Sequence, residues 1–270
     1  MPKTAREVLL ALSYHFDGDM FHMITAIRKK SVRVTDEDVL ESMKKTKSMF
    51  VDICSGDFPD CFKTVDNPPL LLYYYGDLSL VSQPLRVTCV GTRNPNIYQS
   101  STVYNLVKDA EAHFDNRLVV ISGMAYGLDQ AAMKAAMDVN APVVAIIGSG
   151  IDNPYPTDNQ GIYDYCKSGK GLILSEYPAD LSAKPSNFIF RNRLLAAASD
   201  ITFIGGGKKA SGTNTTVRFA LNMGKDVMAL PCNITGDDLT NSIIADGAEV
   251  VLDSQSFIQY IEEANRKNNS

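Results

Sequence analysis

Residues 117–139, RLVVISGMAYGLDQAAMKAAMDV, join a short apolar run to a glycine-containing turn and then to an alanine-rich segment. The apolar run lacks alternating polar residues, which is typical of a strand buried on both faces of a sheet. Glycine in the turn indicates that the backbone approaches another group closely, here interpreted as an anion. A buried strand followed by a turn and a helical segment favours a parallel sheet covered by helices.

The same pattern recurs along most of the chain. Apolar runs rich in β-branched residues alternate with helical stretches, and these runs lie at 86–90, 117–121, 142–147, 171–175, 201–204, 226–230 and 249–252. Such alternation predicts successive βαβ units. We therefore expect an α/β fold with a doubly wound, mostly parallel Rossmann-like sheet over residues 86–270, which ends in a helix at about residues 254–266.

The N-terminal part has a different pattern. Residues 1–65 are predicted to form a small helical domain, because apolar residues from Val8 to Phe16 recur at helical spacing and Thr35 precedes a run of acids as a helix N-cap does. Residues 66–85 are Pro-flanked and aromatic, which predicts an extended connector to the Rossmann-like domain.

Composition is that of an ordinary globular protein: 270 residues, 45% hydrophobic, 21% charged, with a net charge of −5. No membrane-spanning run or secretory signal is evident, so we expect a cytoplasmic protein without membrane contact. Five scattered cysteines that do not cluster with histidine predict reduced thiols, no metal site and no cofactor. An acidic chain binds nucleic acid only where its Lys and Arg side chains gather on one face.

Five turns follow the predicted strands, at 90–95, 121–129, 147–159, 174–178 and 204–214. Four of these turns contain glycine, and the carboxyl ends of parallel strands meet at one edge of a sheet. Backbone N–H groups and helix N-termini exposed at such an edge suit phosphate. The sequence therefore predicts an anion-binding rim.

The candidate binding residues on this rim are Gly91, Arg93, Ser122, Gly123, Gly127, Asp129, Arg191, Asn192, Arg193, Lys208, Lys209, Ser211 and Gly212. The arginines of the Arg-Asn-Arg segment are expected at a helix N-terminus, where their charge requires an anion. Other interpretations stay open. For the two arginines, the alternative is an ion pair with Glu176 or Asp200. For Asp129, it is a helix cap, and for the two lysines, it is a solvated charged loop.

No catalytic constellation accompanies these turns. The three histidines lie outside the glycine turns, and no spacing pairs the carboxylates of Asp129, Asp152 and Glu176. The sequence therefore favours a binding protein over an enzyme.

The order of the turns resembles the DNA-processing protein A family, also called DprA or Smf. The resemblance covers about residues 57–252 and rests on VGTRNP, SGMAYGLDQAA, IGSGIDNPYPTDN, LSEYP, FIFRNRLLAAAS and SGTNTTVRFALNMGKDVMALP. It implies a homodimer with a Rossmann-like domain that binds single-stranded DNA and loads a RecA-type recombinase during natural transformation. It implies no catalytic activity, and it places the candidate residues of the rim in the turns through which the family contacts nucleic acid.

Three departures from the family pattern are visible. The usual Ala-His after the Asp129 motif is replaced by Gln130, Ala131 and Ala132, the usual Pro of the Arg-Asn-Arg segment is Ile189, and glycines replace Glu-Ala at 205–207.

Two rival functions remain open on the sequence. Residues 204–219 have a passing likeness to the glycine motif of nucleotide phosphoribohydrolases, but Asn214, Thr215 and Thr216 stand where that motif requires Glu. The other rival is a nucleotide-binding sensor, because this fold also holds small nucleotide derivatives.

Overall fold

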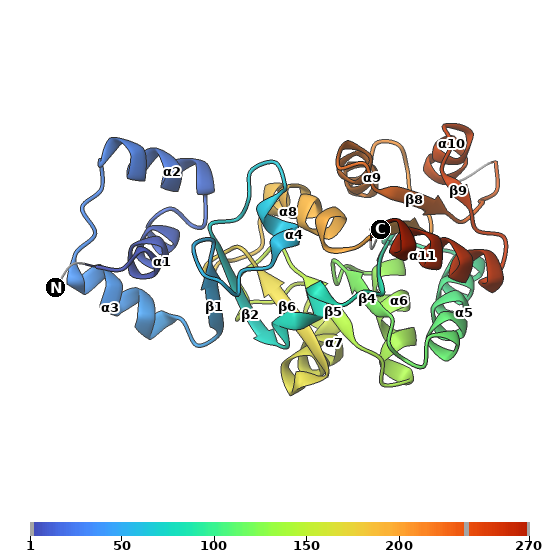
Figure 1. The fold of residues 1–270 in the computed structure, drawn as a ribbon, viewed down its shortest axis with the longest axis horizontal. Helices are drawn as coiled ribbons and strands as arrows, with labels where there is room; N and C mark the ends of the chain where they lie inside the picture. The colour runs from blue at the N-terminus through green and yellow to red at the C-terminus, as the bar shows by residue number, and fades with distance from the viewer. Residues whose placement is uncertain (1–2, 235–237, 269–270) are drawn as a thin grey trace.

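The protein is described by a computed structural model for residues 3–234 and 238–268. Within these residues, one nine-stranded sheet has the order β1-β2-β6-β5-β4-β3-β7-β8-β9 (Figure 1). The strands are β1 (Met49–Asp52), β2 (Leu71–Gly76), β3 (Arg86–Val90), β4 (Val119–Ser122), β5 (Val143–Ile146), β6 (Gly171–Ser175), β7 (Ile201–Ile204), β8 (Asp226–Ala229) and β9 (Glu249–Val250).

Every pairing among β3 to β9 is parallel, and β1 and β2 form an antiparallel edge against β6. The chain leaves β3 toward β4, β5 and β6, and then returns to the other side of β3 with β7. The sheet therefore reverses its direction of growth between β3 and β7. The predicted α/β, doubly wound and mostly parallel fold is confirmed.

The helices follow the strands as expected from the pattern of the sequence. They are α1 (Ala5–His15), α2 (Met20–Lys29), α3 (Asp36–Lys45), α4 (Asp60–Lys63), α5 (Ile97–His113), α6 (Leu128–Asp138), α7 (Gln160–Tyr165), α8 (Pro185–Ala198), α9 (Gly212–Asn222), α10 (Leu239–Ala245) and α11 (Ser254–Asn268), with short helical turns η1 (Leu78–Ser82), η2 (Thr157–Asn159) and η3 (Cys166–Lys170).

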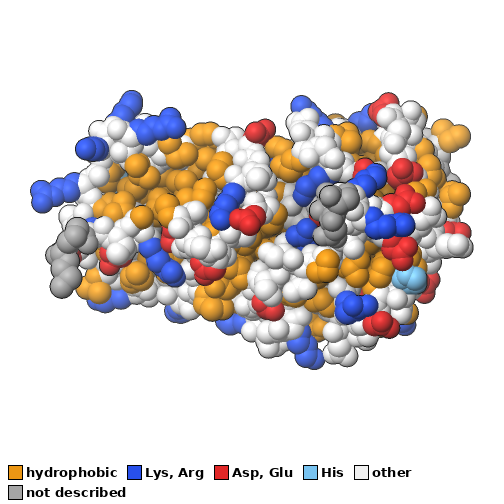
Figure 2. All heavy atoms as spheres, viewed as in Figure 1, with side chains coloured by type: hydrophobic (Ala, Val, Ile, Leu, Met, Phe, Trp, Pro, Cys, Tyr) orange, Lys and Arg blue, Asp and Glu red, His pale blue; other side chains and the backbone are white. Residues whose placement is uncertain are grey.

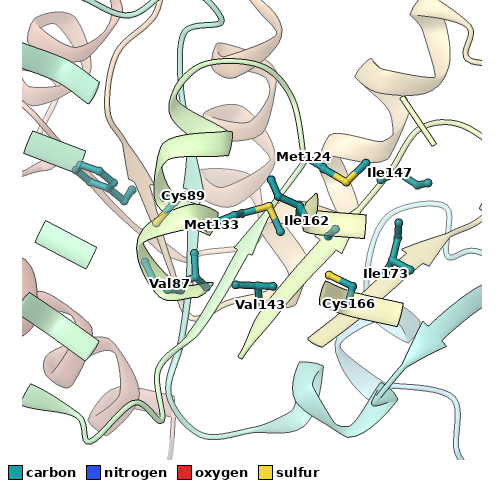
Figure 3. Packing of buried hydrophobic residues seen from close by; sticks show 14 of the residues in the cluster. Val87, Cys89, Met124, Met133, Val143, Ile147, Ile162, Cys166 and Ile173 are labelled. Atoms are coloured by element: carbon teal, nitrogen blue, oxygen red, sulfur yellow. The ribbon is translucent and has the colours of Figure 1, made fainter. Parts of the chain in front are cut away.

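The two faces of the sheet carry separate buried clusters, because successive side chains of a strand point to opposite faces. Val87 and Val143 pack with α5, α6, α7 and α11, and Figure 3 shows them in one buried cluster with Met133 and Ile173. On the opposite face, Val144 and its neighbours pack with α8, α9 and α10. Strands buried on both sides explain the apolar runs without alternation.

Two segments differ in secondary structure from the sequence prediction. Residues 49–52, inside the segment expected to be helical, form β1, and residues 71–76 of the expected connector form β2. Both strands bury apolar side chains against the sheet, which a short run of four to six residues does not reveal by its period alone. The N-terminal group of helices α1 to α3 ends at Lys45.

The N-terminal helices begin as their sequences indicate. Thr35 caps α3 in a capping box with Asp38, as predicted, and Thr4 caps α1 with Glu7 in the same way. Leu10 of α1 belongs to the same buried cluster as the sheet.

Candidate nucleic-acid interface

A cavity of about 810 Å³ lies at the carboxyl ends of β3 and β7. This is the point where the strand order reverses, the usual position of a ligand in an open α/β sheet. Its walls come from three segments: residues 90–94 after β3, residues 183–195 around the first half of α8, and residues 207–216 at the start of α9, with Ala125, Asp129 and Tyr155.

Asp129 holds two of the glycine turns together beneath this cavity. One carboxylate oxygen accepts the backbone N–H of Gly91 at 3.3 Å, and the other accepts those of Gly123 at 3.1 Å and Ala125 at 3.3 Å. Asp129 is buried, and burial raises its pKa against the opposing charge of Arg191. The carboxylate borders the cavity, but its hydrogen bonds go to the protein backbone.

The glycines of these turns lie close to protein atoms, so packing within the protein is enough to require glycine there; that they approach an anion stays a prediction. A Cβ on Gly91 would lie 2.5 Å from Leu128 Cδ1, and one on Gly123 would lie 2.6 Å from Arg191 Nη2. Gly127 has a φ of +80°, and a Cβ on this residue would lie 2.4 Å from the carbonyl oxygen of Thr92.

Ser122 is fully buried and its hydroxyl donates to the Cys89 carbonyl oxygen at 2.6 Å. Ser122, Gly123 and Gly127 do not line the cavity, and the described structure assigns them to shaping the turn. The sequence predicts that these three residues belong to a turn that contacts nucleic acid, and this stays a prediction.

The Arg-Asn-Arg segment lies within a helix and not at its beginning, which corrects the predicted boundary. Helix α8 begins at Pro185, a residue that suits the first helical position because it has no N–H to donate. Arg191 and Arg193 are two residues apart, so they point to nearly opposite sides of α8.

Arg191 points toward the strand ends. Its Nη1 donates to the carbonyl oxygen of Gly123 at 3.0 Å and to that of Ile146, while the residue borders the floor of the cavity. Only 5% of Arg191 is exposed, and burial lowers its pKa to about 10. Arg191 therefore fixes the ends of β4 and β5 and brings positive charge to the cavity floor.

Arg193 points away from the cavity, and its prediction as a nucleic-acid contact is wrong. Its guanidinium makes a bidentate ion pair with Glu176, at 2.8 and 2.5 Å, and also donates to the carbonyl oxygens of Asn67 and Phe190. The residue is 1% exposed, so no strand can reach these donors. The alternative of pairing with Glu176 is the correct one.

Asn192, between the two arginines, connects α8 to α9. Its Nδ2 donates to the carbonyl oxygen of Gly212 at 2.9 Å, and its Oδ1 accepts from Arg191 Nε at 3.3 Å. Asn192 is 7% exposed and borders the cavity. This hydrogen bond places the first turn of α9 against the cavity wall.

The remaining candidates form the exposed side of the cavity. Arg93 is exposed and its guanidinium lies 5.9 Å from the centre of the Phe188 ring. Lys208 is exposed and lines the cavity, whereas Lys209 is exposed but lies outside the lining, and its backbone N–H donates to Asp238.

Ser211 and Gly212 line the cavity at the start of α9. The Ser211 hydroxyl donates to the carbonyl oxygen of Lys208 at 2.6 Å and does not cap the helix. The first N–H groups of α9 therefore have no side-chain partner at their cap and lie at the cavity, where a helix N-terminus favours an anion.

Two aromatic residues of the cavity wall were missed by sequence reasoning. Tyr155 and Phe188 both line the cavity, with ring centroids 5.8 Å apart. Tyr155 lies in the turn at 147–159, and Phe188 lies in α8 three residues before Arg191. For Tyr155, its position inside a predicted strand-end turn was the available signal; Phe188 has no such signal in the sequence.

Residues 3–234 and 238–268 lack two further features. In these ranges, no three side chains of the His, Cys, Asp and Glu types come together in a way that would hold a metal ion. None of the helices there has both the length and the apolar character needed to cross a membrane.

Comparison with known proteins identifies the family. Residues 49–262 match the family of DNA recombination-mediator protein A. The chain is 27% identical to DNA processing protein DprA of Bacillus subtilis, over 84% of this chain and 76% of that protein, and 30% identical to DprA of Streptococcus pneumoniae, over 85% and 79%.

Two solved structures are similar over most of their length. The X-ray structure of DprA from Streptococcus pneumoniae aligns with a TM-score of 0.74 at 27% identity, over 95% of this chain and 93% of that one. The Helicobacter pylori DNA processing protein A, described for its single-stranded DNA binding mode, aligns with a TM-score of 0.71 at 29% identity, over 81% and 98%. The family match and the shared fold agree: this chain belongs to the DNA recombination-mediator protein A family, the DprA or Smf proteins.

Proposed function

We propose that the protein binds single-stranded DNA in the cavity at the β3–β7 strand ends. The observation that carries this proposal is the meeting of exposed cations, a helix N-terminus without a side-chain cap and two aromatic rings in one cavity of about 810 Å³. Surfaces that hold single strands combine positive charge for the backbone with rings on which bases stack. The Helicobacter pylori relative described for single-stranded DNA binding supports it.

The cavity offers separate places for phosphate and base. Arg93, Lys208 and the N-terminus of α9 attract phosphate, because the two side chains are exposed and the helix end is partly positive. The Phe188 ring, half-buried between Tyr155 and the Arg93 guanidinium, offers a face for a base. Arg191 contributes its charge from below without direct contact.

The protein is proposed to bind and not to hydrolyse. Among the described residues that line the cavity, Asp129 is the carboxylate, and three backbone N–H groups already occupy its oxygens. A phosphoribohydrolase needs an accessible carboxylate beside the sugar, and this one is buried.

The proposal is tested by fluorescence anisotropy of a labelled oligothymidylate at several salt concentrations. The wild type, Arg93→Ala and Lys208→Ala are each titrated into it. Each substitution should weaken binding and flatten the slope of log affinity against log salt by about 0.7, the value for one phosphate contact on a single strand. Lys134→Ala, an exposed lysine on α6, is the matched control.

Slopes that stay at the wild-type value in both variants would place the strand elsewhere. Release of free base from nucleoside monophosphates would favour the hydrolase, and a thermal shift with mononucleotides but not with oligothymidylate would favour the sensor.

The wider role proposed is that of a homodimer that delivers single-stranded DNA to a RecA-type recombinase in the cytoplasm, during natural transformation or another recombination process. The segments 219–223 and 242–251 are the proposed self-association surface. Leu221, in the first segment, is 59% exposed, and Leu252, the residue after the second segment, is 78% exposed. Light scattering of Leu221→Glu should report a smaller mass than the wild type if this surface pairs two copies.

A further inference from the structure

Exposed apolar and basic side chains lead from the cavity onto the N-terminal helices. We propose that Phe21, Arg28, Lys29, Lys30 and Arg33, together called the α2 strip, form a second contact surface for the same DNA strand. The inference rests on the proposed function, because it extends the path of a strand that occupies the cavity.

The beginning of α2 lies beside the cavity wall. The Phe21 ring is 6.0 Å from the ring of Phe190, and 53% of Phe21 is exposed. Ile189, the residue before Phe190, lines the cavity and is likewise 53% exposed. A strand leaving the cavity past Ile189 therefore meets an open aromatic ring.

Protein contacts hold α2 in this position. Lys184, just before α8, forms an ion pair with Asp17 at 2.9 Å, in the turn between α1 and α2. Gly18 of that turn lies so close to the β6 end that a Cβ would be 3.0 Å from Pro178 Cδ. From Phe21, the helix α2, ten residues in all, leads over about 15 Å to its basic end.

The basic end has an excess of positive charge. Arg28, Lys29, Lys30 and Arg33 are exposed, with no acid between them, and within the described part of the chain none has an ion pair. In the same N-terminal region Lys3 and Lys45 are paired with acids. Figure 2 shows Lys and Arg side chains bordering hydrophobic ones over these helices.

Stabilisation of the α2 helix dipole accounts for only some of these cations. Arg28 and Lys29 lie in the last turn of α2, where cations stabilise the helix dipole, but Lys30 and Arg33 lie past the last helical residue. An aromatic ring followed by unpaired cations, continuous with the cavity, is the chemistry of a single-strand track.

Oligonucleotide length separates the two surfaces. With the full chain, an oligothymidylate of about six nucleotides should occupy the cavity alone, and one of about twenty should also reach the α2 strip. We expect Phe21→Ala to weaken binding of the long oligonucleotide about tenfold, as removal of one stacked base implies, and to leave that of the short one unchanged. Phe21→Tyr, which keeps an aromatic face, should bind the long one as the wild type does.

The charges are tested by the triple change Arg28→Gln, Lys29→Gln and Lys30→Gln. The salt slope for the long oligonucleotide should flatten by about 0.7 for each phosphate that the variant no longer neutralises, and the slope for the short one should stay the same.

The matched control makes the same change in net charge at three residues of α5, the loop after it and α6 that do not line the cavity. It replaces the exposed Lys108, Arg117 and Lys134 by Gln, and neither oligonucleotide should respond.

Each outcome decides one claim. If neither oligonucleotide binds the wild type, the proposed function fails. If both bind and the α2 variants retain wild-type affinity for the long one, the α2 strip alone is overturned. If Phe21→Ala has a lower Tm and also binds the short oligonucleotide more weakly, then Phe21 stabilises the fold, and its proposed contact with DNA is overturned. Binding of phosphatidylserine vesicles through these cations, without an effect on the long oligonucleotide, would assign the strip to a membrane surface instead.

Discussion

Two arginines of the same segment have unlike roles because of the direction in which each leaves its helix. Arg193 is buried in a bidentate pair with Glu176, and Arg191 is buried against the strand ends with a carboxylate nearby. A buried ion pair is costly to break, since the remaining partner keeps its charge without compensation. Arg93, in contrast, is exposed and lines the cavity.

Arg193→Ala should therefore destabilise the fold by about 3–5 kcal/mol by leaving the Glu176 carboxylate buried and unpaired. Denaturant unfolding monitored by circular dichroism measures this. Arg93→Ala, in contrast, should leave the unfolding midpoint at the wild-type value while reducing DNA affinity. Equal stability of Arg193→Ala and the wild type would contradict a structural role for this ion pair.

Glu111 is a second buried group whose charge matters. It is fully buried on α5, its oxygens make no hydrogen bond of normal geometry with any described residue, and burial raises its pKa to about 8 against a weak opposing effect of the Leu118 backbone. The carboxyl group is thus protonated in the native state at neutral pH.

The free energy of unfolding should fall as pH rises. Between the unfolded pKa of about 4.3 and the native pKa near 8, the native state holds a proton that the unfolded chain has lost, so stability decreases by up to about 1.4 kcal/mol per pH unit from this group. Glu111→Gln should remove this part of the slope in urea titrations from pH 5 to about 8. The exposed Glu37→Gln is the control, and identical slopes in all three proteins would refute the assignment.

At the scale of elements, the start of a helix is set by contacts that a local pattern does not reveal. Helix α8 begins at Pro185, well before Arg191, and α6 begins after Gly127, whose φ of +80° only glycine adopts without strain. The Gly127 Cα faces the Thr92 carbonyl oxygen, so the beginning of α6 and the turn after β3 depend on each other.

Gly127→Ala should therefore destabilise the protein by about 1–3 kcal/mol, since its Cβ would lie 2.4 Å from the Thr92 oxygen at a positive φ. Thermal unfolding gives the loss, with Gly161→Ala as a control because no atom lies within 4 Å of its added Cβ. Because the shifted turn carries Arg93, we also expect weaker DNA binding. A Tm equal to that of the control would show that the turn adapts without strain.

At the scale of the whole molecule, the fold gathers positive charge that the net charge of −5 conceals. The turns after β3 and β7 are distant in sequence, but these strands pair in the middle of the sheet, which brings Arg93 and Lys208 to one cavity. The carboxylates of Asp129 and Glu176 are bound by protein groups, the Gly123 N–H and the Arg193 guanidinium.

The affinity for single-stranded DNA should consequently depend strongly on salt despite the acidic composition. For roughly three to five neutralised phosphates, log affinity should fall against log salt with a slope of about −2 to −3.5. A titration series with a long oligothymidylate measures the slope, and a slope near zero would exclude an electrostatic track.

The sequence by itself determined the order of strands and helices from residue 86 onward and the parallel sheet that they form, because burial on both faces and turn chemistry leave local patterns. It also located Arg93, Lys208, Ser211 and Gly212 near the cavity. It did not reveal β1 and β2, since short apolar strands resemble short buried helical segments in their residues.

Only the tertiary structure decided which side chains face the cavity and which support it. Arg191, Arg193 and Asp129 have the residue types of a phosphate site, yet their partners are Gly123, Glu176 and backbone N–H groups brought together from distant segments. Whether a charged group serves a ligand or the fold depends on burial and on the partners that remain within hydrogen-bonding distance. Those are properties of the packed chain, and no spacing along the sequence contains them.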